Sequence, residues 1–205
     1  ITEKFAYTYK PQYFKSLSVN RQTQTLNSIK RECYQTTGNQ ELEEKHKKIE
    51  ALLKEIQGLN IVKDYANLAD RYSQLIELGQ TTTNVYNSAA WNLLLTKEFE
   101  KAQEFIIKGL GENPTNLYLQ GNLANYFLLT GTYSDAEEIY LKFKTQSISS
   151  TLSWKKAVAQ DLELFEELGI YTQDFERVRQ TLGIVKRETA KKIEAVKKEI
   201  IGLEI

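Results

Sequence analysis

Apolar residues recur every three or four positions along most of this chain, which is the spacing of one face of an α-helix. Long stretches contain no Gly or Pro, and few segments alternate strictly between apolar and polar residues, so the pattern predicts a mostly helical protein. We expect helices over residues 16–36, 40–57, 61–78, 84–95, 98–110, 116–129, 134–144, 151–168, 173–182 and 184–203.

Glycines supply most of the predicted breaks between these helices. Gly58 is expected to end the helix over 40–57, and Gly131 lies at a tight turn between the helices over 116–129 and 134–144. Ser134 and Glu137 have the spacing of a capping box, in which each side chain bonds a free backbone N–H of the other residue.

Two stretches of the chain read alike when one is displaced by 34 residues. The paired positions are Ala90 and Ala124, Leu93 and Phe127, Phe99 and Tyr133, Ala102 and Ala136, and Ile106 and Tyr140. A period of this length is typical of stacked helix-turn-helix units. Gly169 and Tyr171 continue the pattern 38 residues after Gly131 and Tyr133, so the next unit contains about one more helical turn.

These residues resemble the tetratricopeptide repeat family. The unit near 117 supplies Leu123, Ala124, Phe127, Gly131, Ala136 and Tyr140, and the unit near 83 supplies Ala90, Leu93, Ala102, Ile106 and Pro114. The resemblance is clear over 83–144 and continues in diverged form to about 182. It implies an all-α, right-handed superhelix of about four to six helical hairpins. We expect N-terminal hairpins over 1–80, tetratricopeptide-like repeats over 81–182 and a capping helix over 183–205.

The resemblance also implies a binding groove, because the first helix of each repeat lines the groove of this family. Carried over position by position, the groove residues are Asn87, Trp91, Leu94, Tyr118, Asn122, Asn125, Leu128 and Lys155. Asparagine amides both donate to and accept from a peptide backbone, and tryptophan is a favoured interface anchor. We expect an extended or helical peptide there. The alternative is that Trp91 and Tyr118 pack against a neighbouring helix of the fold itself.

Some members of this family grip a terminal carboxylate with lysines and asparagines. Asn122 matches one of those positions, but Asn87 stands at the lysine position and Trp91 at its asparagine partner. The resemblance therefore argues against capture of the C-terminal peptides of heat-shock chaperones.

The charge balance narrows the class of partner. The chain has 27 basic and 27 acidic residues, whereas a general nucleic-acid binder needs a basic surplus. The same balance argues against a surface held by anionic lipid. The sequence contains no run of 18 apolar residues, which a membrane-spanning helix would need. We expect a protein or peptide partner and a cytoplasmic location. No methionine occurs, so we interpret the chain as a fragment that could have lost a leader or an upstream domain.

Enzyme, metal and cofactor chemistry find no support in the sequence. His46 is the only histidine, and its neighbours Lys45, Lys47 and Lys48 predict a solvated position. Cys33 is the only cysteine, so no second thiol is present for redox or metal binding; this fits a reducing compartment. No glycine-rich phosphate loop precedes a helix.

The helix expected over 184–203 carries one apolar stripe, which predicts a cap over the last open face of the repeats. The alternatives are a homodimer formed through this helix, or a spacer to another domain. Together these features predict a protein-interaction scaffold or regulatory module of a larger bacterial protein. A different class stays open: an accessory region that packs against a catalytic domain of the same polypeptide.

Overall fold

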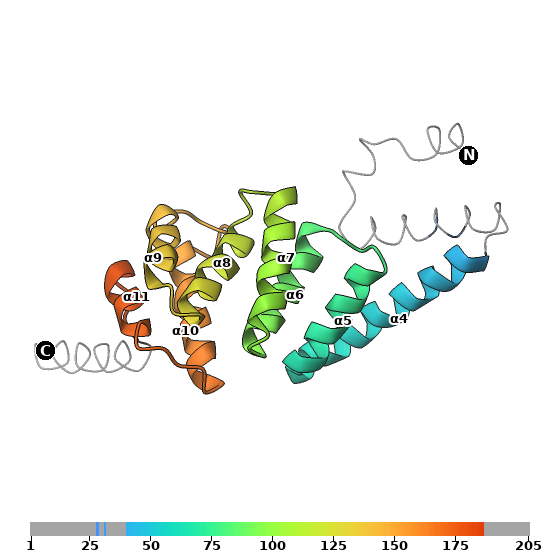
Figure 1. The fold of residues 1–205 in the computed structure, drawn as a ribbon, viewed down its shortest axis with the longest axis horizontal. Helices are drawn as coiled ribbons and strands as arrows, with labels where there is room; N and C mark the ends of the chain where they lie inside the picture. The colour runs from blue at the N-terminus through green and yellow to red at the C-terminus, as the bar shows by residue number, and fades with distance from the viewer. Residues whose placement is uncertain (1–27, 29–30, 32–39, 187–205) are drawn as a thin grey trace, which may run out of the picture. The chain divides into compact units, whose positions relative to one another are not determined.

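The computed structural model describes residues 28, 31 and 40–186, and these form eight α-helices and no β-strand (Figure 1). The all-α prediction is therefore confirmed for this part of the chain. The predicted helices over 16–36 and 184–203 lie almost wholly outside it, and residues 184–186 are not helical. The helices are α4 (Gln40–Val62), α5 (Tyr65–Glu77), α6 (Thr83–Leu95), α7 (Phe99–Glu112), α8 (Leu117–Leu129), α9 (Tyr133–Lys142), α10 (Trp154–Glu167) and α11 (Phe175–Leu182).

The chain divides between Glu55 and Ile56 into two compact units, and α4 runs through the division. In the first unit the side chain of His46 is buried, so the predicted solvated position is wrong. Its Nε2 lies 3.2 Å from the carboxylate of Glu50, which also pairs with Arg31 at 3.0 Å. The prediction relied on the three neighbouring lysines. Adjacent residues of a helix point in different directions, so exposed lysines do not place His46 in solvent.

The turns between helices repeat with the period seen in the sequence. Lys63, Lys97 and Gly131 all have positive φ, at 56°, 64° and 87°, and each lies two residues before the start of α5, α7 or α9. The 34-residue period therefore starts one hairpin earlier than the sequence pattern indicated. The predicted break at Gly58 is wrong: α4 continues past it to Val62, and the turn uses a lysine where the later turn has glycine.

We expect Lys97→Gly to raise the free energy of unfolding by about 0.5–1 kcal/mol. The left-handed conformation costs an L-residue with a β-carbon roughly 1–2 kcal/mol, and the added freedom of glycine in the unfolded chain offsets part of this gain. Urea denaturation measures the change. The matched variant is Gly131→Ala, at the equivalent turn, where a β-carbon would meet no other atom within 4 Å. This substitution should lower the free energy of unfolding by about 1 kcal/mol. A stabilised Gly131→Ala would contradict the shared turn geometry.

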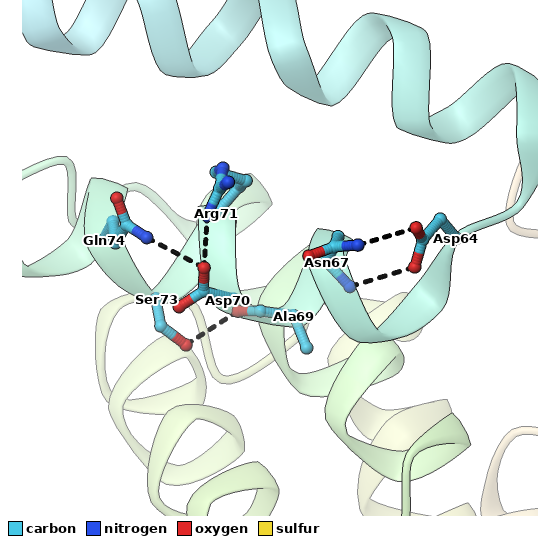
Figure 2. Close-up of polar contacts among 7 residues, drawn as sticks. All are labelled: Asp64, Asn67, Ala69, Asp70, Arg71, Ser73 and Gln74. Carbon is cyan, nitrogen blue, oxygen red and sulfur yellow. Dashed lines mark hydrogen bonds and ion pairs between the residues drawn. The ribbon is translucent and has the colours of Figure 1, made fainter.

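Side-chain caps fix the starts of several helices. In α5 the carboxylate of Asp64 accepts bonds from the backbone N–H of Asn67 at 3.2 Å and from its Nδ2 at 2.7 Å (Figure 2). These two bonds lower the pKa of Asp64. Further along the helix, the Ser73 hydroxyl donates to the carbonyl of Ala69 at 2.8 Å, and Asp70 pairs with Arg71 (Figure 2). Thr82, Asn116 and Ser153 cap α6, α8 and α10 in the same way as Asp64.

The capping box predicted from Ser134 and Glu137 is wrong. The cap position of α9 is Thr132, which makes no side-chain capping bond, and Ser134 lies inside the helix. Glu137 instead accepts hydrogen bonds from the hydroxyls of Tyr133 at 2.8 Å and Thr181 at 3.0 Å. Tertiary packing of α9 with α11 has replaced a local cap.

Two adjoining apolar clusters form the core of the second unit. One is built from α5, α6 and α7, the other mainly from α8, α9, α10 and α11, and Leu129 packs against both. The four alanines that repeat in the sequence are fully buried: Ala90, Ala102, Ala124 and Ala136. Small side chains let packed helices approach closely.

Helices contact both their neighbours in sequence and their counterparts in the next hairpin. The sequential contacts run α5–α6, α6–α7, α7–α8 and α8–α9, and α6 also contacts α8 while α9 contacts α11. The first helices α6 and α8 therefore lie against each other, and so do the second helices α9 and α11. The α6–α8 contact brings together the predicted groove residues.

Candidate functional site

A pocket of about 230 Å³ is formed by α6, α8, α10 and the segment that joins α9 to α10. We call it the α6–α8–α10 pocket. Its walls include four groove residues predicted from the family resemblance: Asn87, Trp91, Tyr118 and Asn122. They come from two successive first helices, which contact each other. The 34-residue repeat therefore places these side chains around one hollow.

An amide–amide contact joins the two first helices at the pocket. Asn122 of α8 donates from Nδ2 to the backbone oxygen of Asn87 at 3.1 Å and to its Oδ1 at 3.0 Å. Asn122 is buried, whereas Asn87 is half-buried on α6. The pair fixes the register of α6 against α8 and orients the Asn87 amide at the pocket wall.

The aromatic residues of the pocket differ in their exposure. The Trp91 ring packs against Phe165 of α10, with ring centroids 5.5 Å apart, and is half-buried. Tyr118 is 50% exposed at the rim. Trp154 is 1% exposed, packs against Phe143 at 5.2 Å, and its indole N–H has no hydrogen-bond partner within the described residues. Trp91 therefore packs against a helix of the fold, and an open pocket lies beside it.

Asn125 is fully buried and does not line the pocket. Its Oδ1 accepts a 2.8 Å bond from the Tyr140 hydroxyl, and its Nδ2 donates to Oδ2 of Asp161, also at 2.8 Å. A polar chain thus runs from α9 through α8 to α10. Its last member, Asp161, lies on the pocket wall.

The environment of Asp161 disfavours its charge. Burial raises the pKa of this carboxyl to about 7, although the hydrogen bond from Asn125 acts in the opposite direction. Burial, reinforced by the negative charge of Asp161, also raises the pKa of Tyr140 well above its usual value. Carboxyls with such shifts concentrate at functional sites.

The remaining groove residues lie elsewhere. Lys155 is exposed on α10 and does not line the pocket; its Nζ lies 3.5 Å from the position that a β-carbon at Gly183 would occupy. Leu94 and Leu128 are fully buried in the core. The family's groove positions therefore separate into pocket residues, core residues and one exposed lysine.

The sequence pattern contains a signal for Asp161 that the family resemblance does not supply. Trp154, Val158 and Phe165 are buried on α10, and Asp161 follows Trp154 by seven residues and Val158 by three. That spacing places a carboxyl on the apolar face of a helix. Acidic residues are mostly exposed unless they are paired, so a carboxyl on this face indicates a site.

Metal-binding clusters and membrane-spanning helices were sought among the described residues. Within residues 28, 31 and 40–186, no three His, Cys, Asp or Glu side chains are grouped so as to hold a metal ion. No helix of that same part of the chain is long and apolar enough to cross a bilayer. Comparisons with protein families, curated proteins and solved structures found no match for this chain.

Proposed function

We propose that this chain is a protein-interaction module that holds a segment of a partner protein in the α6–α8–α10 pocket. One observation carries the proposal: four residues chosen from the sequence as groove residues line a single pocket on two adjacent first helices. The proposed role is binding rather than catalysis, because Asp161 is the one acidic or basic residue of the pocket lining, and no Ser, Thr, Cys, Lys or His accompanies it.

The proposed architecture is a right-handed superhelix of tetratricopeptide-like hairpins. Three features support it: the starts of α5, α7 and α9 are spaced by 34 residues, the starts of α6 and α8 have the same spacing, and the repeated alanines are buried. Such hairpins present their first helices along one face, and partners bind there.

The chemistry of the pocket fits a peptide segment. Its volume of about 230 Å³ lies below the roughly 300–1,000 Å³ of sites for drug-sized molecules, so it suits a single side chain. Tyr118 offers an exposed aromatic ring at the rim. The Nδ2 of Asn87 and the amide of Gln160 make no hydrogen bond within residues 40–186, so both can bond a peptide backbone.

We expect Tyr118→Ala to weaken the binding of peptides by about tenfold or more, because truncation of an interface tyrosine commonly costs over about 1.4 kcal/mol. Random peptides displayed on phage are selected on the immobilised wild-type chain, and the affinities of the enriched peptides are then measured by fluorescence anisotropy. The matched control is Tyr171→Ala. Tyr171 is 69% exposed and lies outside the pocket, so its removal should leave the affinity unchanged.

Circular dichroism shows whether both variants are folded. Peptides that bind the wild type and the Tyr118→Ala variant equally well would place the binding surface elsewhere. A wild-type chain that enriches no peptide sequence would contradict the proposed function itself.

A further inference from the structure

The pocket lining has one acidic side chain, Asp161, and no cation among residues 40–186 pairs with it. We propose that the α6–α8–α10 pocket receives a lysine or arginine side chain of the partner, with its cation paired to the carboxylate of Asp161. This inference rests on the proposed function, and it narrows the ligand to a peptide with a basic residue at the bound position.

The Asp161 carboxylate has no cationic partner among residues 40–186. Among residues 40–186 it makes no ion pair, and its one hydrogen bond is the 2.8 Å contact of Oδ2 with Asn125. The other carboxylate oxygen, Oδ1, accepts no hydrogen bond from those residues. No Lys, Arg or His lines the pocket. Asp161 is partly buried, and a charge there is unfavourable without a partner. A cation brought by a ligand would supply that partner.

The other walls of the pocket are mostly apolar. Trp91, Leu117, Trp154 and Val158 line the same pocket and are aromatic or aliphatic. The basic side chains have long aliphatic stems that pack on apolar surface while the charged head reaches a polar group. Aromatic faces also attract cations. A pocket with apolar walls and one carboxylate is therefore complementary to such a side chain along its length.

The same features disfavour other occupants. An acidic side chain or a terminal carboxylate would face Asp161 with no cation in the lining to offset the repulsion. A purely apolar side chain would remove the remaining water from the carboxylate without replacing it. The inferred ligand is thus opposite in charge to the terminal carboxylate that some tetratricopeptide proteins bind.

The interaction should depend on pH, because the cation pairs only with ionised Asp161. The groups that face this carboxyl are Asn125 of α8, which donates to it, and Tyr140 of α9, which bonds Asn125; α6 contributes only neutral side chains to the pocket. Since burial raises the pKa of Asp161 to about 7, ionisation spans neutral pH. Affinity for a basic peptide should therefore rise as the pH increases through this range.

The test uses the full chain and peptide mixtures in which only the central residue is fixed, as Lys, Arg, norleucine or Glu. The wild type, Asp161→Asn and Glu163→Gln are compared by fluorescence anisotropy. Asn keeps an oxygen that can accept the bond from Asn125. Glu163 lies on the same helix, is half-buried and does not line the pocket, so it controls for loss of a carboxylate on α10.

We expect the wild type and the Glu163→Gln variant to bind the Lys and Arg mixtures about tenfold or more tightly than the norleucine mixture at about pH 8. The Asp161→Asn variant should lose this preference. The wild-type preference should also shrink at about pH 6, whereas the binding of Asp161→Asn should not change with pH.

The outcomes separate the two proposals. If the wild type binds the mixtures, and Tyr118→Ala weakens this binding, but the central residue has no effect, the proposed function stands and the basic ligand is wrong. A Glu preference would also overturn it. If the wild type binds none of the mixtures and selects no peptide from the phage library, both proposals fail.

Discussion

Asp161→Asn is expected to raise the free energy of unfolding by about 2–4 kcal/mol at about pH 8, and by much less at about pH 4. The pKa of this carboxyl rises from 3.8 to about 7 in the folded protein. The folded state therefore binds the proton more tightly than the unfolded state. Each unit of pKa difference corresponds to about 1.4 kcal/mol, and the half-buried position of Asp161 reduces the total through solvent screening.

The sign follows from proton binding in the two states. Below about pH 4 the carboxyl is protonated in both states, and the stability that the folded state gains by binding this proton more tightly is fully present. As the pH rises towards 7, the unfolded chain releases the proton first, so the wild type loses stability over this interval. The amide of the variant does not titrate, and it retains an acceptor for Asn125.

Urea denaturation of the wild type, Asp161→Asn and Glu163→Gln at several pH values measures this effect. The difference in unfolding free energy between the wild type and Asp161→Asn should grow steadily between about pH 4 and 7 and then level off. A difference that is constant with pH, or a variant that is less stable than the wild type at high pH, would show that the folded protein tolerates the ionised carboxyl. Either result would also remove the argument for an uncompensated charge in the pocket.

Gly109→Ala is expected to lower the free energy of unfolding by about 2 kcal/mol. Gly109 lies on α7 where this helix meets both first helices that form the pocket. An added β-carbon would lie 2.7 Å from Cδ1 of Leu119 on α8 and 3.0 Å from Cβ of Tyr86 on α6. Leu119 is fully buried, and the β-carbon of Tyr86 is fixed to the backbone, so α7 itself has to move.

The control for this substitution lies on the same helix. Gly111 is exposed, and a β-carbon there would meet nothing within 4 Å. Gly111→Ala should therefore be neutral or stabilising by up to about 1 kcal/mol, because alanine favours the helix over glycine. Thermal or urea unfolding of both variants provides the comparison. Equal stability of the two variants would contradict the close approach of α7 to α6 and α8.

Helices with regular apolar spacing and clear breaks were predicted well from the sequence. The predicted range 84–95 became α6 at Thr83–Leu95, and 116–129 became α8 at Leu117–Leu129. The repeated alanines are buried. In these segments local pattern and tertiary packing agree, which is why the periodicity sufficed.

Errors arose where tertiary structure chose differently from local signals. The turn at Lys63 uses a left-handed lysine, and a lysine gives no sign of a turn in the sequence. Gly58 was predicted to end a helix, but it lies within α4. Asn125 was assigned to an open groove, yet it connects Tyr140 to Asp161 inside the fold. Such networks join residues from three helices, and their spacing along the chain does not reveal them.

The pocket was predictable only on the side formed by the repeats. Asn87, Trp91, Tyr118 and Asn122 follow from the 34-residue period, whereas Trp154 and Asp161 come from the longer third hairpin, where the register shifts. The segment that joins α9 to α10 contributes Ile148 and Leu152, and irregular backbone of this kind carries no periodic signal.

Binding of a partner in the α6–α8–α10 pocket can be followed through residues of the chain itself. It contains two tryptophans, Trp91 and Trp154, and both line the pocket. The most direct measurement is a titration of the ¹⁵N-labelled chain with a peptide selected by the wild type, followed through the two indole N–H resonances. We expect both resonances to shift as the peptide is added, and to shift much less in Tyr118→Ala at the same peptide concentrations. Indole resonances that stay fixed while backbone amides elsewhere shift would place the binding surface outside the pocket and contradict the account.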